Sequence, residues 1–292
     1  MQLRRFEKQF GIEDMRKSAG NRLTQLIEQA ESMTGRKVVI IIDEYDAPLL
    51  DVLHDETKLE AVRTIMQEFY APIKANSSHI HFAFITGITK FSQLSIFSTI
   101  NNLTNISMDP EFSTICGITK DELDTVLKED IALLASKNHV SFERMRELLR
   151  ENYDGYHFSR EGEDIFNPYS LMRSFAAGFI DNYWYASGTS TYLIHQMQHF
   201  HTDVTTLDDM FAFSSSFDRP TEKMSDALPL LYQSGYLTIK GYDPEFQLYT
   251  LAYPNKEVRK GFIESLMPAY VHLPARENTF YVVSFIKDLR AG

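Results

Sequence analysis

Residues 37–46 read KVVIIIDEYD, and this stretch predicts the class of fold. Five consecutive aliphatic residues, Val38 to Ile42, are all β-branched and do not alternate with polar residues. Such a run is typical of a strand that is buried on both faces of a parallel sheet. Three carboxylates, Asp43, Glu44 and Asp46, follow it. The sequence therefore predicts an interior strand that carries acidic side chains at its carboxyl end.

The segments on either side of this strand predict a β-α-β unit. Residues 13–33 have apolar side chains at helical spacing, and Gly35 ends that pattern just before the strand. A second amphipathic helix is expected over residues 59–69, followed by the strand-like run HIHFAFIT at 79–86. A right-handed crossover makes the two strands of such a unit parallel. We therefore expect an α/β nucleotide-type fold in the first third of the chain.

The composition predicts a soluble globular protein. The 292 residues are 43% hydrophobic and 13% aromatic, which excludes wholesale disorder. No apolar run approaches the roughly 18 residues of a membrane span, and the single cysteine, Cys116, has no partner for a disulfide. We therefore expect a cytoplasmic protein without a membrane anchor. The net charge of −11 argues against binding nucleic acid by overall charge alone.

Helices are expected to dominate the middle of the chain. Thr119 and Glu122 have the spacing of a capping box, and helical patterns follow over residues 141–152, 167–179 and 190–200. The last third then changes character. A helix in DALPLLYQSG is closed by Gly235, two alternating strands flank residues 241–245, and NKEVRKGFIESLMPAY returns to helix. This order is compatible with a winged-helix-like element.

Asp43 and Glu44 are the strongest candidates for chemistry. Open α/β sheets bind their ligands at the carboxyl ends of the strands, which is where these two carboxylates lie. In P-loop ATPases an aspartate at this place holds Mg²⁺ through water, and the adjacent glutamate orients and deprotonates the attacking water. The alternative is a strand that ends in solvated acids, and the motif alone leaves both interpretations open.

Thr86 is the next candidate because it ends the neighbouring strand. A polar residue at that position often contacts the γ-phosphate or the attacking water, but the residue taken alone favours a threonine that caps a strand before a turn at Gly87. Lys90 is a surface charge unless it faces a phosphate. No G-x-x-x-x-G-K-[ST] segment occurs in the chain, and TGRK at 34–37 lacks the spacing of a phosphate loop.

Other patterns are weaker. DETK at 55–58 resembles half of a nuclease motif but lies where a helix starts, and His195 and His199 form an i,i+4 pair without an evident third metal ligand. The aromatic runs YDGYHF at 153–158 and NYWYASGTSTYL at 182–193 have few basic neighbours. We therefore expect them to pack in a core or a domain interface rather than to stack on bases.

Together these stretches resemble the AAA-ATPase-like family of the Bacteroidetes type, P-loop proteins that often carry a C-terminal PD-(D/E)xK nuclease-like domain. The resemblance covers roughly residues 30–270. It rests on VVIIIDEYDAPLL (38–50), FITGITKFSQLSIFSTINNLTNIS (84–107), CGITKDEL (116–123), YDGYHF (153–158), FNPYSL (166–171), NYWYASGTSTYL (182–193) and LLYQSGYLTIKGYD (230–243).

The resemblance implies a STAND-like, AAA-type architecture: a partial P-loop NTPase core with a parallel sheet over residues 1–116, a helical lid over 117–212, a winged-helix-like domain over 213–272 and a tail over 273–292. Asp43 and Glu44 fall on the Walker B positions of the family, and Thr86 falls near its sensor position. The implied cofactors are ATP and Mg²⁺, with Asp43 binding the metal through water.

The phosphate loop of the family, an RPRRFGKS-like segment, would precede residue 1. Either an N-terminally shortened chain or a decayed paralogue explains its absence, and the tail stops before any nuclease-like domain. Without a phosphate loop we expect weak or absent ATP binding and no useful turnover.

Two functions follow as hypotheses. The first is an ATP- and Mg²⁺-dependent ATPase or switch, in which nucleotide state moves the helical and winged-helix-like parts against the core. The second is a non-enzymatic scaffold that binds protein or nucleic acid through the basic residues Lys223, Lys240, Lys256, Arg259 and Lys260. A nuclease role has no convincing site in this chain, and the sequence leaves the oligomeric state open.

Overall fold

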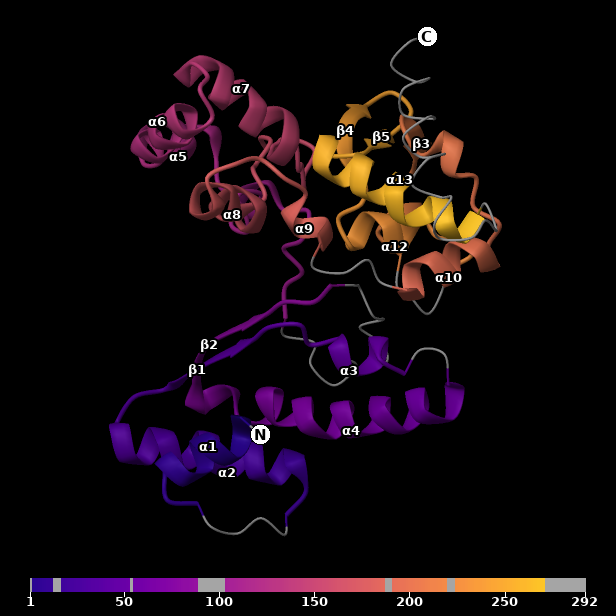
Figure 1. The fold of residues 1–292 in the computed structure, drawn as a ribbon. Coiled ribbons are helices and arrows are strands. Elements are labelled where there is room, and N and C mark those ends of the chain that lie inside the picture. The colour runs from indigo at the N-terminus through magenta and orange to yellow at the C-terminus, as the bar shows by residue number, and fades with distance from the viewer. Residues whose placement is uncertain are drawn as a thin grey trace. The chain divides into compact units, whose positions relative to one another are not determined.

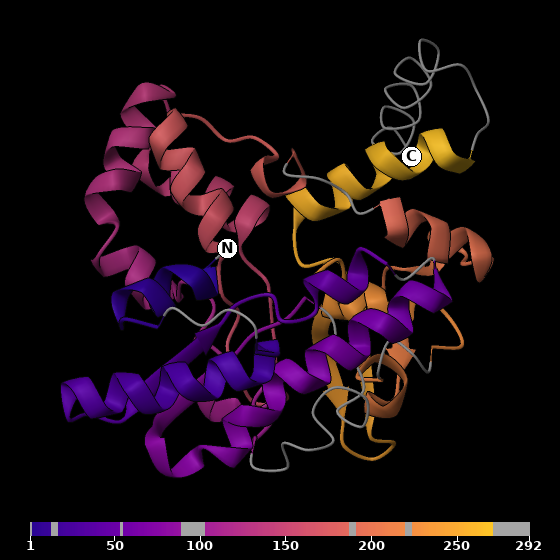
Figure 2. The ribbon, with the colours of Figure 1, turned by 90° about the horizontal axis from the view of Figure 1, so that it is seen from below.

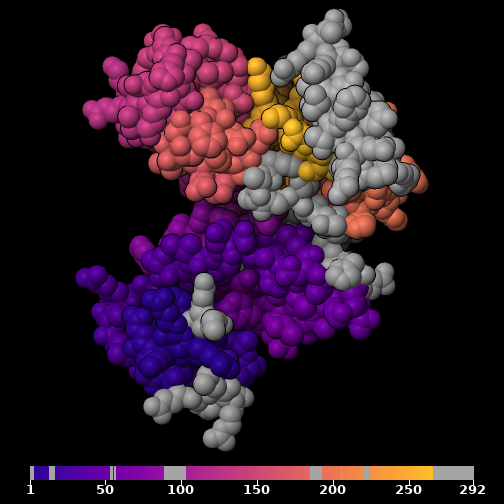
Figure 3. Space-filling model, in the orientation of Figure 1, coloured from indigo at the N-terminus to yellow at the C-terminus, as the bar shows by residue number. Residues whose placement is uncertain are grey.

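The computed structural model describes residues 2–12, 17–52, 55–88, 103–186, 191–219 and 224–270. The described chain is a mixed α/β protein that divides into two compact units, here called unit 1, up to Thr104, and unit 2, from Asn105 onward. In Figure 3 unit 1 is coloured indigo to purple and unit 2 magenta to yellow.

Unit 1 combines helices with a pair of strands (Figure 1). Its elements are α1 (Gln2–Gln9), α2 (Ala19–Thr34), β1 (Val38–Ile42), α3 (Ala47–Leu50), α4 (Glu56–Ala75), the 3₁₀ helix η1 (Ser77–His79) and β2 (Ile80–Ile85). The predicted helices and strands of the β-α-β unit are confirmed. Gly35 caps α2 in the left-handed conformation, with φ of +65°, as its place after the helical pattern predicts.

The strands β1 and β2 pair in parallel, with Ile42 opposite Ile85. One face of the pair packs against the apolar side chains of α2 and α4, which lie next to each other (Figures 1 and 2). Ile27, Leu49 and Ile73 are the most deeply buried members of this core. The packing holds the carboxyl ends of both strands at one edge.

The prediction that residues 38–42 are buried on both faces is wrong for the described chain. Val39 is 51% exposed and Ile41 is 72% exposed, whereas Val38, Ile40 and Ile42 are partly buried. The reason is that the described helices cover one face of a sheet with only two described strands, so the side chains alternate between core and surface. A uniformly aliphatic run therefore does not indicate whether one or both faces of the sheet are covered.

Unit 2 is mainly helical. Its elements are η2 (Pro110–Phe112), α5 (Lys120–Thr125), α6 (Lys128–Lys137), α7 (Phe142–Tyr153), α8 (Pro168–Ala177), α9 (Tyr183–Ala186), α10 (Thr191–His199), η3 (Val204–Thr206), β3 (Met210–Ala212), α11 (Ser214–Phe217), α12 (Leu228–Gln233), β4 (Thr238–Asp243), β5 (Leu248–Ala252) and α13 (Lys256–Tyr270). The capping box of Thr119 and Glu122 is confirmed at the start of α5. The predicted helices over 141–152, 167–179 and 190–200 correspond to α7, α8 and α10.

The sheet of unit 2 is antiparallel, in the order β3-β5-β4. The predicted hairpin is β4 and β5, and α12 ends before Gly235, whose φ is +80°. A single apolar cluster contains Tyr156 and Leu193 together with Leu237 and Phe262. Residues on both sides of position 213 thus share a core, and the division into 117–212 and 213–272 stays a prediction.

None of the helices in the described ranges has the length and apolar character that crossing a membrane requires.

Candidate functional site

The carboxyl edge of the β1–β2 pair brings Asp43, Glu44 and Thr86 together. Asp43 and Glu44 directly follow β1, Thr86 directly follows β2, and the parallel register places Ile42 beside Ile85. The three side chains predicted from the sequence therefore lie at one place in unit 1.

The hydroxyl group of Thr86 links the two strand ends. Thr86 Oγ1 donates a hydrogen bond to Asp43 Oδ1 and accepts one from the backbone N–H of Glu44 at 3.3 Å. The backbone adds two bonds: Thr86 N donates to Ile42 O at 2.8 Å, and Tyr45 N donates to Thr86 O at 2.9 Å. Thr86 is thus fixed against the turn that carries both acids, beyond the role of a residue that merely caps its own strand.

Glu44 has an unusual backbone. Its φ is +52°, in the left-handed region that residues other than glycine rarely adopt. Such conformations cost of order 1 kcal/mol or more and are common where a side chain has to be presented to a ligand. The side chains of Asp43 and Glu44 are both exposed at this turn. They are therefore accessible to a ligand at the edge of the sheet.

Asp46 behaves differently from the two acids that precede it. It is fully buried, and its Oδ1 accepts a hydrogen bond from the backbone N–H of Ile88 at 3.0 Å. Burial raises the pKa of Tyr70 to about 12, and the charge of Asp46 adds to this shift. The sequence shows three acids in DEYD without distinguishing them. The short helix that follows, with proline at its start, was the available sign that Asp46 lies at a helix N-terminus.

The donor set at this edge suits Mg²⁺ together with a phosphate ligand. Carboxylate and hydroxyl oxygens are the protein groups that Mg²⁺ accepts, and in phosphate-transferring sites one or two carboxylates suffice because phosphates and waters complete the shell. The described residues contain no group of three or more histidine, cysteine or acidic side chains arranged to hold a metal ion. Asp43 and Glu44 are two exposed carboxylates of the kind that can bind Mg²⁺ alongside a phosphate.

Of the weaker candidates, DETK has a structural role and the histidine pair has no third metal ligand among the described residues. Asp55 caps α4 by accepting from Lys58 N at 3.1 Å, so DETK marks a helix start. His195 and His199 are exposed on α10 and belong to no metal-ligating group among the described residues. Lys90 lies outside the described residues.

The basic residues of the scaffold hypothesis have partners nearby in unit 2. Lys256 pairs with Glu151 at 2.7 Å, Arg259 with Asp208 at 3.4 Å, and Lys260 with Glu264 at 3.9 Å. Lys240 donates to two backbone carbonyls. Lys223 lies outside the described residues. The described basic residues of this region thus each contact an acidic side chain or a backbone carbonyl. Binding of protein or nucleic acid by this region stays a prediction.

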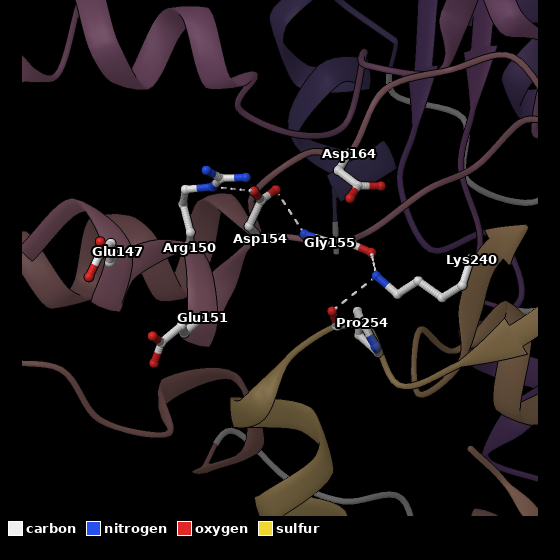
Figure 4. Close-up of a pocket in the computed structure, with 8 residues that line it drawn as sticks. All are labelled: Glu147, Arg150, Glu151, Asp154, Gly155, Asp164, Lys240 and Pro254. Atoms are coloured by element: carbon white, nitrogen blue, oxygen red, sulfur yellow. Dashed lines mark hydrogen bonds and ion pairs between the residues drawn. The ribbon is translucent and has the colours of Figure 1, made fainter. Parts of the chain in front are cut away.

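The aromatic residues of YDGYHF pack in cores, as expected: Tyr153 and Tyr156 are buried. Between them, Asp154 and Gly155 line a polar pocket of about 410 Å³ in unit 2, together with Asp164, Lys240, Pro254 and three charged residues of α7, Glu147, Arg150 and Glu151 (Figure 4). No local sequence pattern indicates this pocket, because its walls come from segments about 100 residues apart.

Lys240 is at the centre of the contacts in this pocket. Its Nζ donates to Gly155 O at 2.6 Å and to Pro254 O at 3.2 Å (Figure 4). Burial lowers the pKa of Lys240 and raises that of Asp154, whereas a hydrogen bond from His157 lowers the pKa of Asp164. Lys240 thereby joins β4 to the turn after α7 and to the residues before α13.

Comparison with known proteins supports an AAA-ATPase-like family. Residues 1–97, which contain the acids and Thr86, match the family model described as "Predicted AAA-ATPase". A protein of Azotobacter chroococcum mcd 1, described as "Uncharacterized protein in vnfD 5'region", is 31% identical over 274 residues, which cover 92% of this chain and 50% of that protein. The chain thus spans about half the length of this curated relative. No solved structure matches the chain.

Proposed function

We propose that this chain contributes the acidic edge of an ATP and Mg²⁺ site in an AAA-type, STAND-like ATPase that acts as a molecular switch. The observation that carries the proposal is the contact of the Thr86 hydroxyl with Asp43 beside the exposed Glu44. An acid pair and a hydroxyl at adjacent parallel strand ends is the arrangement that phosphate-transferring α/β proteins use. The family match over residues 1–97 supports the same reading.

Each residue has a distinct role in this proposal. Asp43 would hold the metal through a bound water. The hydrogen bond that the Thr86 hydroxyl donates to Asp43 would keep this carboxylate oriented. Glu44, exposed and next in sequence, would orient the attacking water and accept its proton. The metal, when bound with ATP, would neutralise charge that develops on the phosphates.

The chain supplies the acids but not the usual loop for the phosphates. Its 292 residues contain no G-x-x-x-x-G-K-[ST] segment, whose backbone N–H groups would wrap them. The test of function therefore uses the protein in the longest form that its gene encodes.

The first test replaces Glu44 by glutamine. Glutamine keeps the size of the side chain but does not accept a proton, so we expect ATP hydrolysis to fall by about 10²- to 10⁴-fold while ATP binding is retained. Glu28→Gln, an exposed change on α2, is the matched control and should leave hydrolysis unchanged. The proposal is wrong if the protein neither binds nor hydrolyses ATP, or if Glu44→Gln hydrolyses it at the wild-type rate.

We also propose that residues 213–272 form a winged-helix-like domain. The support is the order of the described elements, in which the helices α11 and α12 are followed by the antiparallel strands β4 and β5 and by the helix α13. Because its described basic residues are engaged with acids or carbonyls, a nucleic-acid role ranks second to the nucleotide role.

A further inference from the structure

Asp46 is the one acid of DEYD to which the proposed site gives no role. It is fully buried, whereas Asp43 and Glu44 are exposed. A buried carboxylate is costly unless its oxygens accept hydrogen bonds, so its partners indicate its purpose. One partner is the backbone N–H of Ile88, 3.0 Å from Asp46 Oδ1. Ile88 lies two residues after Thr86.

Hydrogen bonds hold both Thr86 and the loop that follows it. The backbone N–H of Thr86 donates to Ile42 O, and the backbone N–H of Tyr45 donates to Thr86 O. These two bonds continue the pairing of the strands. The bond from Ile88 N to Asp46 is a side-chain contact beyond the end of the sheet, and it fixes the loop where the ladder of backbone bonds has ended.

Gly87 shows how closely this loop is packed. A Cβ atom at Gly87 would lie 2.4 Å from the Tyr45 ring and 2.9 Å from Asp46 Oδ1. Both distances are shorter than real Cβ atoms show to their neighbours. The backbone of Gly87 therefore lies so close to the DEYD turn that there is no room for a side chain. The turn and the loop are therefore fitted to each other at the positions that flank Thr86.

We propose that Asp46 is a positioning residue: by holding the loop of residues 86–88, it keeps the Thr86 hydroxyl on Asp43. This role in hydrolysis rests on the proposed function, whereas the positioning of the loop is a property of the chain without any ligand. The acids of DEYD thereby have different roles. Asp43 and Glu44 are exposed to the ligand, whereas Asp46 holds the loop that contains Thr86, the residue that orients Asp43.

The test measures hydrogen exchange of the Ile88 amide in the free chain. Asp46→Ala removes the acceptor, so we expect this amide to exchange at least about tenfold faster. Asp46→Asn retains a carbonyl oxygen that accepts the same bond, and should restore most of the protection. Asp51→Ala, an exposed acid at the end of the same short helix, is the control and should leave the exchange unchanged.

The outcome separates positioning from general stability. The inference is wrong if the Ile88 amide stays protected in Asp46→Ala. It is also wrong if Asp46→Asn and Asp46→Ala increase the exchange rate equally throughout unit 1. Should Asp46→Ala fail to fold, Gly87→Ala tests the same fit with Asp46 in place. We expect this variant to raise exchange at Ile88 but not in α2, and an unchanged Ile88 amide would overturn the inference.

The consequence for hydrolysis is measured in the longest form of the protein. Asp46→Ala should lower kcat for ATP about tenfold and leave KM unchanged, with Asp46→Asn closer to wild type. Equal kcat in the wild type and Asp46→Ala would contradict the functional role. If the wild type does not hydrolyse ATP, the proposed function fails, and the exchange measurement still decides whether Asp46 positions the loop.

Discussion

Glu257, at the start of α13, is a second buried acid, and it makes the stability of unit 2 depend on pH. It is 1% exposed, and its Oε1 accepts from Ser170 Oγ at 3.0 Å and from Trp184 N at 2.8 Å. Its Oε2 is buried without a hydrogen-bond partner among the described residues. Burial raises the pKa of Glu257 from 4.5 to about 6, although these hydrogen bonds oppose the shift and Asp181 adds to it.

The sign of the pH effect follows from this raised pKa. The folded protein binds the proton of Glu257 more tightly than the unfolded chain does. The stabilisation from protonation is therefore complete below pH 4.5 and is lost as the pH rises through about 6. A shift of this size corresponds to roughly 2 kcal/mol in the free energy of unfolding.

We expect Glu257→Gln to be more stable than the wild type at pH 8, by roughly 1–2 kcal/mol, because the amide keeps an oxygen acceptor and carries no charge. The measurement is denaturant unfolding at pH 5 and pH 8. Glu264→Gln, on the exposed part of the same helix, should follow the wild type at both values. A pH dependence in Glu257→Gln equal to that of the wild type would disprove the assignment.

Among the elements of unit 2, the turn that follows α7 is closely packed at Gly155. Gly155 has φ of +94°, and a Cβ atom there would lie 2.3 Å from Pro254 O and 2.8 Å from Lys240 Nζ. The turn, the start of β4 and the approach to α13 therefore meet without room for a side chain.

Gly155→Ala should destabilise the protein by about 2–4 kcal/mol, since the change combines an unfavourable φ with displacement of the Lys240 contacts. Gly241→Ala is the matched control, because a Cβ atom there meets Thr250 at an ordinary 3.5 Å and φ is not positive. It should change the free energy of unfolding by less than about 1 kcal/mol. Equal effects of the two changes, measured by denaturant unfolding, would show that the close approach at Gly155 is not important.

Helices and strands were predictable from the sequence where the signal is local. Apolar spacing and the capping pairs gave α2, α4, α5 and α7, and alternation gave the β4–β5 hairpin. The exposed face of β1 was not predictable, since the burial of Val39 and Ile41 depends on what covers the sheet.

At the scale of the whole molecule, the candidate site was predictable to the extent that it depends on strand ends. Asp43, Glu44 and Thr86 each follow a strand, and parallel pairing brings such positions together. The burial of Asp46 and Glu257 depends on contacts with segments that are distant in sequence. The same holds for the hydrogen bonds of Lys240 to two backbone carbonyls. No local pattern distinguishes these buried charges from the many exposed ones.

We expect the edge formed by Asp43, Glu44 and Thr86 to bind a nucleotide together with Mg²⁺. The most direct test of this expectation is ATP binding to the longest form of the protein, measured with Mg²⁺ and with a chelator. We expect the wild type and the control Asp51→Asn to bind ATP at least about tenfold more tightly with Mg²⁺ than with the chelator, and Asp43→Asn to lose this difference. An undiminished Mg²⁺ dependence in Asp43→Asn, or no ATP binding by the wild type, would show that this edge is not the nucleotide site.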